Sequence, residues 1–184
     1  MAMIEPVEFL NQYESKLLHD MIRLCTDRKE LKDRLLDTPD ITEKWDDIIK
    51  EYMIDAIKEY NAYPMAALGW AMYVGMGVAK YWDEDWEVYG KVDNLYVHMR
   101  DQRGFDYLDE VVRGDIYGYK DKDFTDCEDL VQSCAQLALD RIRHEQIEPQ
   151  SPMAYYVFAR SIKVLYLIGA SVGLRRLGYN LVKA

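Results

Sequence analysis

The chain has 184 residues, of which 49% are hydrophobic and 30% are charged, and it contains only 5 Pro and 10 Gly. This composition excludes a disordered or low-complexity chain, and the length is enough for one sizeable core. The formal net charge of -10 argues against a nucleic-acid partner, because phosphate binding needs clustered cations. We therefore expect one folded domain over residues 1–184.

The cysteines and the first residues bear on the cellular compartment. Cys25, Cys127 and Cys134 are odd in number and lack the paired spacing of zinc or redox sites, which predicts reduced thiols. The first residues, MAMIEPVEFLNQYESK, do not show the basic stretch and apolar core of a secretory signal. We expect a cytoplasmic protein.

Helical spacing dominates the first 60 residues. Apolar residues recur at steps of three and four over 6–36, which predicts one long amphipathic helix. The proline-containing segment 37–39 interrupts this pattern. A second amphipathic helix is predicted over 41–60, with Thr38 or Asp40 as its N-cap.

The third predicted helix begins at Pro64 and is apolar nearly all round, so we expect it to lie at the centre of the fold. Residues four apart lie one above another on a helix. Small residues at this spacing form a ridge that another backbone can approach closely. The ridge consists of Ala67, Ala71, Gly75 and Ala79.

The same stretch is uncharged over 61–79, which is near the shortest length that can span a membrane. Asn61, Pro64 and the many Ala and Gly residues in this run favour a buried helix of a bundle instead. We expect no membrane partner.

Helical spacing from Trp86 to Met99 predicts a fourth helix. Acidic side chains favour a helix N-terminus, so Asp83 or Asp85 is the predicted N-cap. Gly104 is the predicted end of this helix.

Two further helices are predicted before the last one. A short helix is expected over 106–113, followed by a loop. Thr125 and Glu128 match a capping box, which predicts a helix over 126–145.

The last predicted helix covers 152–177, with Ser151 as N-cap, and is again apolar nearly all round. Gly169 and Gly173 form a second pair of small residues four apart. This helix and the third one both begin with Pro-Met-Ala. We expect these two helices to cross each other or their symmetry mates.

Together these elements predict an all-α, single-domain bundle of about six or seven helices with two central apolar helices. Because each apolar helix follows an amphipathic helix, the chain could consist of three-helix halves, 1–85 and 86–184, related by a pseudo-two-fold axis. Shared organisation without duplication is the alternative.

Metal and cofactor chemistry have little support in the sequence. The three histidines, His19, His98 and His144, include no Glu-x-x-His pair of the kind that di-iron bundles use. The acidic loop that begins at Asp121 does not match an EF-hand, because Asp126 and Gln132 stand where that loop needs Gly and Glu. Walker A, Gly-x-Ser-x-Gly and His-Glu-x-x-His motifs are missing as well. We predict no metal, no cofactor and no recognisable catalytic site.

Two cations lie one turn apart in the otherwise apolar last helix, Arg160 and Lys163. Buried cations must be paired, either with acidic neighbours or with a ligand. The structural interpretation is a set of salt bridges to acidic helices. The functional interpretation is an anionic ligand inside the bundle, with Tyr156 and Trp70 as walls.

The chain contains 15 Tyr and 4 Trp, residues that suit both cores and protein interfaces. The leading functional hypothesis is a helical interaction or assembly protein, a homodimer without catalysis. The alternative is a binding or regulatory module for a small anionic molecule.

Overall fold

Residues 6–36 and 38–179 are described by a computed structural model, and they form eight α-helices and no strand. This confirms the predicted all-α bundle. A 3-10 turn (Phe105–Tyr107) and a π-helical turn (Val111–Ile116) flank the shortest helix. The helices are α1 (Pro6–Asp27), α2 (Pro39–Glu43), α3 (Trp45–Tyr60), α4 (Pro64–Tyr89), α5 (Leu95–Arg103), α6 (Leu108–Glu110), α7 (Asp121–His144) and α8 (Pro152–Arg176).

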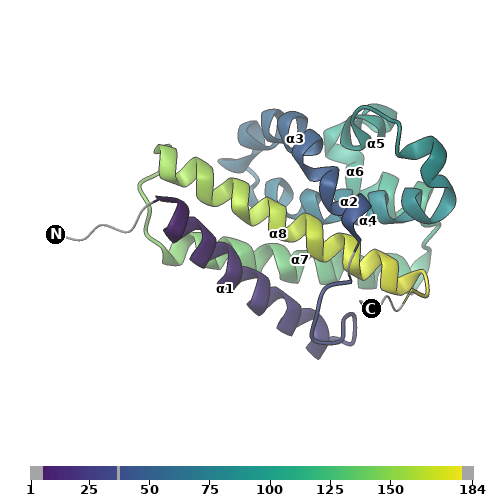
Figure 1. The fold of residues 1–184 in the computed structure, drawn as a ribbon, viewed down its shortest axis with the longest axis horizontal. Helices are drawn as coiled ribbons and strands as arrows, with labels where there is room; N and C mark the ends of the chain where they lie inside the picture. The colour runs from purple at the N-terminus through teal and green to yellow at the C-terminus, as the bar shows by residue number, and fades with distance from the viewer. Residues whose placement is uncertain (1–5, 37, 180–184) are drawn as a thin grey trace.

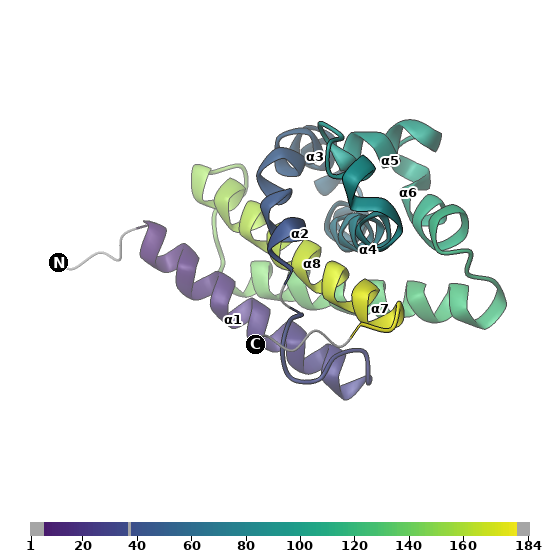
Figure 2. The same ribbon diagram turned by 45° about the vertical axis from the view of Figure 1, so that its right-hand side comes forward.

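The two Pro-Met-Ala helices, α4 and α8, lie at the centre and pack against each other (Figure 1). Figure 2 looks nearly along α4 and shows α3, α5, α6, α7 and α8 around it. On its other side α8 packs against α1. Burial on several sides is the reason that both sequences are apolar nearly all round.

The contact between α4 and α8 is close enough to exclude side chains. A Cβ atom on Gly75 would overlap the carbonyl oxygen of Tyr166, and one on Gly169 would overlap that of Met72. A Cβ atom on Gly173 would lie 3.2 Å from the Cβ atom of Ala79, the last residue of the ridge on α4. The ridge of α4 is buried along its whole length, at Ala67, Ala71, Gly75 and Ala79.

Core tyrosines connect the helices through their hydroxyl groups. The Tyr13 hydroxyl of α1 lies 2.7 Å from the Ser161 Oγ atom of α8. Others donate to backbone carbonyls of distant segments, at 2.6–2.7 Å: Tyr52 to Ala67, Tyr117 to Met76 and Tyr166 to Ile41. These bonds satisfy polar atoms that would otherwise be buried without a partner.

The prediction of one helix over 6–36 is wrong, because α1 ends at Asp27. Lys29 has φ 65°, in the left-handed region that stops an α-helix. Leu31 and Leu36 are nevertheless buried. The apolar residues after α1 therefore contact the core from turns and not from a helix.

The second predicted helix, 41–60, is divided in the structure. α2 ends at Glu43, and Lys44 separates it from α3. Thr38 occupies the N-cap position of α2, but its side chain makes no capping hydrogen bond.

An internal kink divides α4. Asp85 has φ -166° and ψ 86°, and its Oδ1 atom accepts a hydrogen bond of 3.3 Å from the Val88 N–H. It therefore caps the last turn of α4, as predicted. The continuous helix predicted from Trp86 to Met99 is wrong, because the chain leaves the helix after Tyr89 and restarts at α5, where the Asn94 side chain is the N-cap.

The capping box predicted at Thr125 and Glu128 is also wrong. α7 already begins at Asp121, and the Thr125 hydroxyl donates within the helix to the Lys122 carbonyl at 3.1 Å. Ser151 does cap α8, since its Oγ atom accepts from the backbone N–H three residues on at 3.1 Å.

Nearly all of the buried hydrophobic side chains described form one connected cluster, to which both sequence halves contribute. The pseudo-two-fold relation between 1–85 and 86–184 is not confirmed. By length and composition α8 could cross a membrane, but 78% of the relevant window is buried within the bundle, as in a core helix. The three cysteines are buried and free.

Candidate functional site

The two cations singled out in α8 contact the same carboxylate of α1. Arg160 Nη1 lies 3.1 Å from Glu14 Oε1, and Lys163 Nζ lies 3.4 Å from Glu14 Oε2. Arg160 Nη1 also donates to Asn11 Oδ1 at 2.8 Å. Their side chains are 27% and 36% exposed, so the pair lies at the surface and holds α8 to α1.

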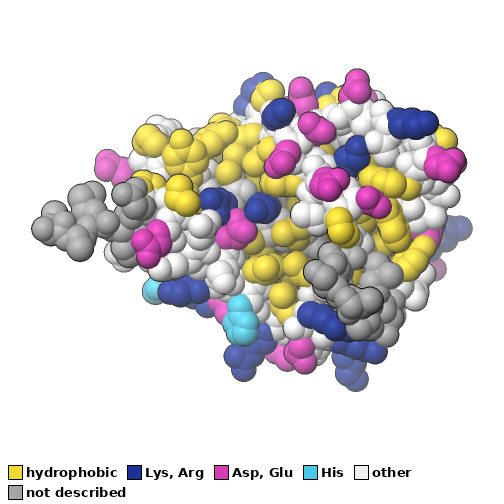
Figure 3. Space-filling view, viewed as in Figure 1, with side chains coloured by type: hydrophobic (Ala, Val, Ile, Leu, Met, Phe, Trp, Pro, Cys, Tyr) yellow, Lys and Arg dark blue, Asp and Glu magenta, His cyan; other side chains and the backbone are white. Residues whose placement is uncertain are grey.

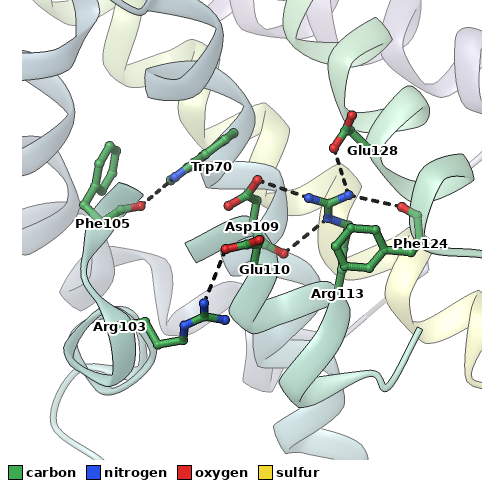
Figure 4. A network of polar contacts seen from close by, with 8 residues as sticks. All are labelled: Trp70, Arg103, Phe105, Asp109, Glu110, Arg113, Phe124 and Glu128. Carbon is green, nitrogen blue, oxygen red and sulfur yellow. Dashed lines mark hydrogen bonds and ion pairs between the residues drawn. The ribbon is translucent and has the colours of Figure 1, made fainter. Parts of the chain in front are cut away.

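The other two predicted ligand-binding residues lie elsewhere. Tyr156 is 49% exposed at the start of α8, where its ring packs edge-on against Tyr155. Trp70 lies on α4, and its indole N–H donates to the Phe105 carbonyl at 2.7 Å (Figure 4). Trp70 lines a pocket whose walls include neither Arg160 nor Lys163. The structure therefore does not bring the four residues together.

That pocket has a volume of about 450 Å³ and lies between α4, α6 and α7. We call it the Trp70 pocket. Aromatic rings form one side of it: Trp70 and Tyr73 stand nearly perpendicular, with 5.6 Å between ring centroids. The full lining is Ala62, Tyr63, Met65, Ala66, Trp70, Tyr73, Asp109, Glu128, Val131, Gln132 and Ala135.

Tyr73 differs from Tyr13, Tyr52, Tyr96 and Tyr166, whose hydroxyls are hydrogen-bonded within the protein. Its side chain is 1% exposed, yet no hydrogen bond of its hydroxyl is found among the described residues. Among the described residues, every side-chain N or O atom that is fully buried has a hydrogen-bond partner. The unpaired Tyr73 hydroxyl is therefore not fully buried, and we place it at the surface of the pocket that Tyr73 lines. Burial raises the pKa of this hydroxyl far above its ordinary value, so it stays protonated.

A buried guanidinium holds the two carboxylates of the pocket (Figure 4). Arg113, which is 2% exposed, lies on the π-helical turn. Its Nη2 atom lies 3.1 Å from Asp109 Oδ2, and its Nη1 atom lies 3.0 Å from Glu128 Oε2. Nη1 and Nε also donate to the carbonyls of Phe124 and Asp109, at 3.2 and 3.3 Å.

Aromatic rings enclose the same guanidinium. Its Cζ atom lies 3.8 Å from the Phe124 ring centroid and 5.6 Å from that of Tyr73. One cation thus faces two carboxylates, so Arg113, Asp109 and Glu128 together carry a formal charge of one negative unit when both carboxylates are ionised. Burial raises the pKa of Asp109, and the neighbouring Arg113 charge only partly opposes this rise.

The pocket is equipped for binding more clearly than for catalysis. It offers aromatic faces, the hydroxyls of Tyr63 and Tyr73, the Gln132 amide and two carboxylates, and its lining contains no histidine, cysteine or serine. Within residues 6–36 and 38–179, no group of three or more His, Cys, Asp or Glu side chains is placed to hold a metal ion.

The sequence analysis assigned neither Tyr73 nor Asp109 a role, and it considered Glu128 only as part of a capping box. The spacing of Asp109 and Arg113, four residues apart, could have indicated an ion pair on a helix. Nothing in the local pattern indicated that Arg113 is buried, because its partners Phe124 and Glu128 come from another helix.

Several large hydrophobic side chains remain exposed. Figure 3 shows yellow side chains gathered over the first turns of α8 and towards α3. These two helices touch there through Tyr60 and Phe158, whose ring centroids are 4.8 Å apart. The exposed large hydrophobic residues are Val7, Ile54, Ile57, Tyr63, Val88, Tyr107, Tyr155 and Tyr156.

Comparison with known proteins identifies no relative of this chain. It matches no protein-family model, and neither the curated proteins nor the solved structures give a match.

Proposed function

We propose that this protein is a binding module for a small organic molecule, which occupies the Trp70 pocket. The observation that carries the proposal is the Tyr73 hydroxyl: the residue is 1% exposed, and its hydroxyl has no protein partner among the described residues and opens to the pocket. A polar atom of an occupant can take the place of water as the partner of this hydroxyl.

Size and composition support the same proposal. Ligand pockets in proteins have volumes of roughly 300–1,000 Å³ and combine apolar walls with a few polar groups. The Trp70 pocket has this character, with Val131 and Ala135 beside the two aromatic rings. Its walls are held in place, because Trp70 is hydrogen-bonded to the Phe105 carbonyl and both carboxylates are hydrogen-bonded to Arg113. Such preorganisation lowers the entropic cost of binding.

The site differs from the anionic site considered from the sequence. Arg160 and Lys163 already share the Glu14 carboxylate, so little positive charge is left for a ligand. The idea of a binding module is retained, and its location moves from α8 to the space between α4, α6 and α7.

A fragment screen followed by protein-detected NMR tests the proposal. Ala66 lines the pocket and is partly exposed, so Ala66→Phe should fill the pocket while preserving the fold. Ala154→Phe, at a partly exposed helical alanine outside the lining, is the matched control. We expect fragments to shift the Trp70 indole signal in the wild type and in Ala154→Phe, and to lose binding in Ala66→Phe. Equal binding by all three proteins would refute the proposal.

We also propose self-association, as a homodimer, through the exposed aromatic and aliphatic residues at the start of α8 and the end of α3. Tyr156 and Ile57 are 49% and 46% exposed there, and tyrosine suits interfaces because it buries area with little loss of entropy. The ridge of small residues does not contribute, since it is buried between α4 and α8.

Sedimentation velocity over the micromolar range tests this second proposal. Ile57→Glu with Tyr156→Glu should shift the protein to monomer. Val88→Glu, at an exposed apolar residue near the far end of α4, should not. A wild-type protein that is monomeric at every concentration would contradict the proposal.

A further inference from the structure

The charged residues that line the Trp70 pocket indicate which ligand it would take. Asp109 and Glu128 are the charged side chains in the lining, and both are acidic. Arg113 contacts both of them: hydrogen bonds to the protein engage four of its five N–H groups, and Phe124 covers one face of its guanidinium. An anion in the pocket would meet two carboxylates without an available cation.

The aromatic walls favour a cation as well. Trp70 and Tyr73 both line the pocket, where their rings pack edge to face at 78°. The faces of such rings attract positive charge, and the attraction grows when water is excluded. Tyr63, 65% exposed, stands at the mouth of the pocket and adds a third ring.

The Tyr73 hydroxyl adds a polar group to this lining. Because the Tyr73 hydroxyl opens to the pocket and has no protein partner among the described residues, its oxygen can accept a hydrogen bond from an N–H group of a ligand. The Glu128 side chain, 45% exposed, can accept another while it keeps its Oε2 contact with Arg113. Aromatic walls alone would suit a quaternary ammonium, whereas these acceptors favour a cation that carries N–H groups.

We infer that the Trp70 pocket binds a small organic cation, a protonated amine attached to an apolar or aromatic group. This inference rests on the proposed binding function and specifies its ligand. The amine would lie between the Asp109 and Glu128 carboxylates and the Tyr73 hydroxyl. Its apolar part would lie against Trp70 and Val131.

Four probes of similar shape test the inference by calorimetry: benzylamine, benzyltrimethylammonium, benzyl alcohol and benzoate. We expect benzylamine to bind at least about tenfold more tightly than benzyl alcohol, and benzoate more weakly still. Benzyltrimethylammonium should fall between benzylamine and benzyl alcohol, because it keeps the charge and lacks the N–H donors. Benzylamine affinity should also fall as the salt concentration rises.

Two conservative variants separate the contributions. Glu128→Gln should weaken benzylamine about tenfold and leave benzyl alcohol unchanged, because it removes charge at nearly constant shape. Tyr73→Phe should weaken benzylamine more than it weakens benzyltrimethylammonium. Glu110→Gln, at a carboxylate that faces Arg103 outside the lining, is the matched control and should leave all four affinities unchanged. Circular dichroism checks that each variant is folded.

The outcomes distinguish this inference from the proposed function. If the neutral or anionic probe binds as tightly as benzylamine, and Ala66→Phe abolishes that binding, the pocket binds ligands and the inference of a cation is wrong. The inference is also overturned if Glu128→Gln and Glu110→Gln affect benzylamine equally. If no probe and no screened fragment responds to Ala66→Phe, both the inference and the proposed function are wrong.

Discussion

Gly169 of α8 lies directly against the carbonyl oxygen of Met72 in α4, where the two apolar helices cross. Gly75 has the reciprocal position against the Tyr166 carbonyl. At both places the obstructing atom belongs to a backbone, which cannot rotate away as a side chain can. The separation of α4 and α8 is therefore set by these two glycines.

Gly169→Ala should destabilise the fold by about 1–3 kcal/mol or more, because the new methyl group forces the helices apart. The measurement is the free energy of unfolding from urea titration. Gly114→Ala is the matched control: the nearest atom to its added Cβ belongs to the Phe124 ring, at 3.9 Å. There we expect no loss, and a gain of up to about 1 kcal/mol from helix propensity. Equal effects of the two substitutions would contradict this account of the crossing.

Arg113→Met should destabilise the fold by about 2–4 kcal/mol, because it removes a buried cation from two carboxylates and two carbonyls. Glu128 is partly exposed and can be hydrated again, which keeps the loss below that of a fully buried pair. Arg103→Met removes an arginine that is 44% exposed and also faces two carboxylates, and it should cost less than about 1 kcal/mol. Thermal and urea unfolding of both variants measure the difference.

Glu14→Gln should lower stability by no more than about 1 kcal/mol at low salt, although it removes the carboxylate partner of both Arg160 and Lys163. The pairs are partly exposed, and dissolved ions screen them. The difference between wild type and variant should therefore shrink at high salt. An effect that is large and independent of salt would show that Glu14 acts through packing.

The buried tyrosines predict a loss of stability in alkali. Burial raises the pKa of Tyr81 to about 12, and it raises the pKa values of Tyr52, Tyr73 and Tyr166 further. In the unfolded chain these hydroxyls lose their protons near pH 10, so above that pH the unfolded state binds fewer protons than the folded state. Stability should be fully present below about pH 10 and fall steadily as the pH rises further.

Tyrosinate absorbance, recorded together with circular dichroism, checks this prediction. The signal of the buried tyrosines should appear in the same pH range as the loss of helix. If all 15 tyrosines ionise while the helical signal is unchanged, the burial described for these side chains is wrong.

Local sequence patterns were sufficient for the central elements of this fold. Proline at the first turn, Ser151 as a cap and a continuous apolar surface specify α4 and α8 without reference to the rest of the chain. The spacing of small residues likewise marks a face for close backbone approach, because helical periodicity is a local property. The cap at Asp85 was predictable for the same reason, because an N-cap side chain accepts a hydrogen bond from the helical turn that directly follows it.

Tertiary packing decided the remainder. The spacing of apolar residues beyond Asp27 looked helical, yet these residues reach the core from turns, which only the neighbouring helices make possible. Arg113 is an ordinary arginine in the sequence, and it is buried because α7 supplies Phe124 and Glu128 to receive it. The Trp70 pocket joins α4, α6 and α7, whose side chains are far apart along the chain. The sequence by itself determined which helices are central, because the periodicity of apolar residues is a property of a single helix. Only the tertiary structure determined where polar groups meet in a cavity, because a pocket is lined by several elements.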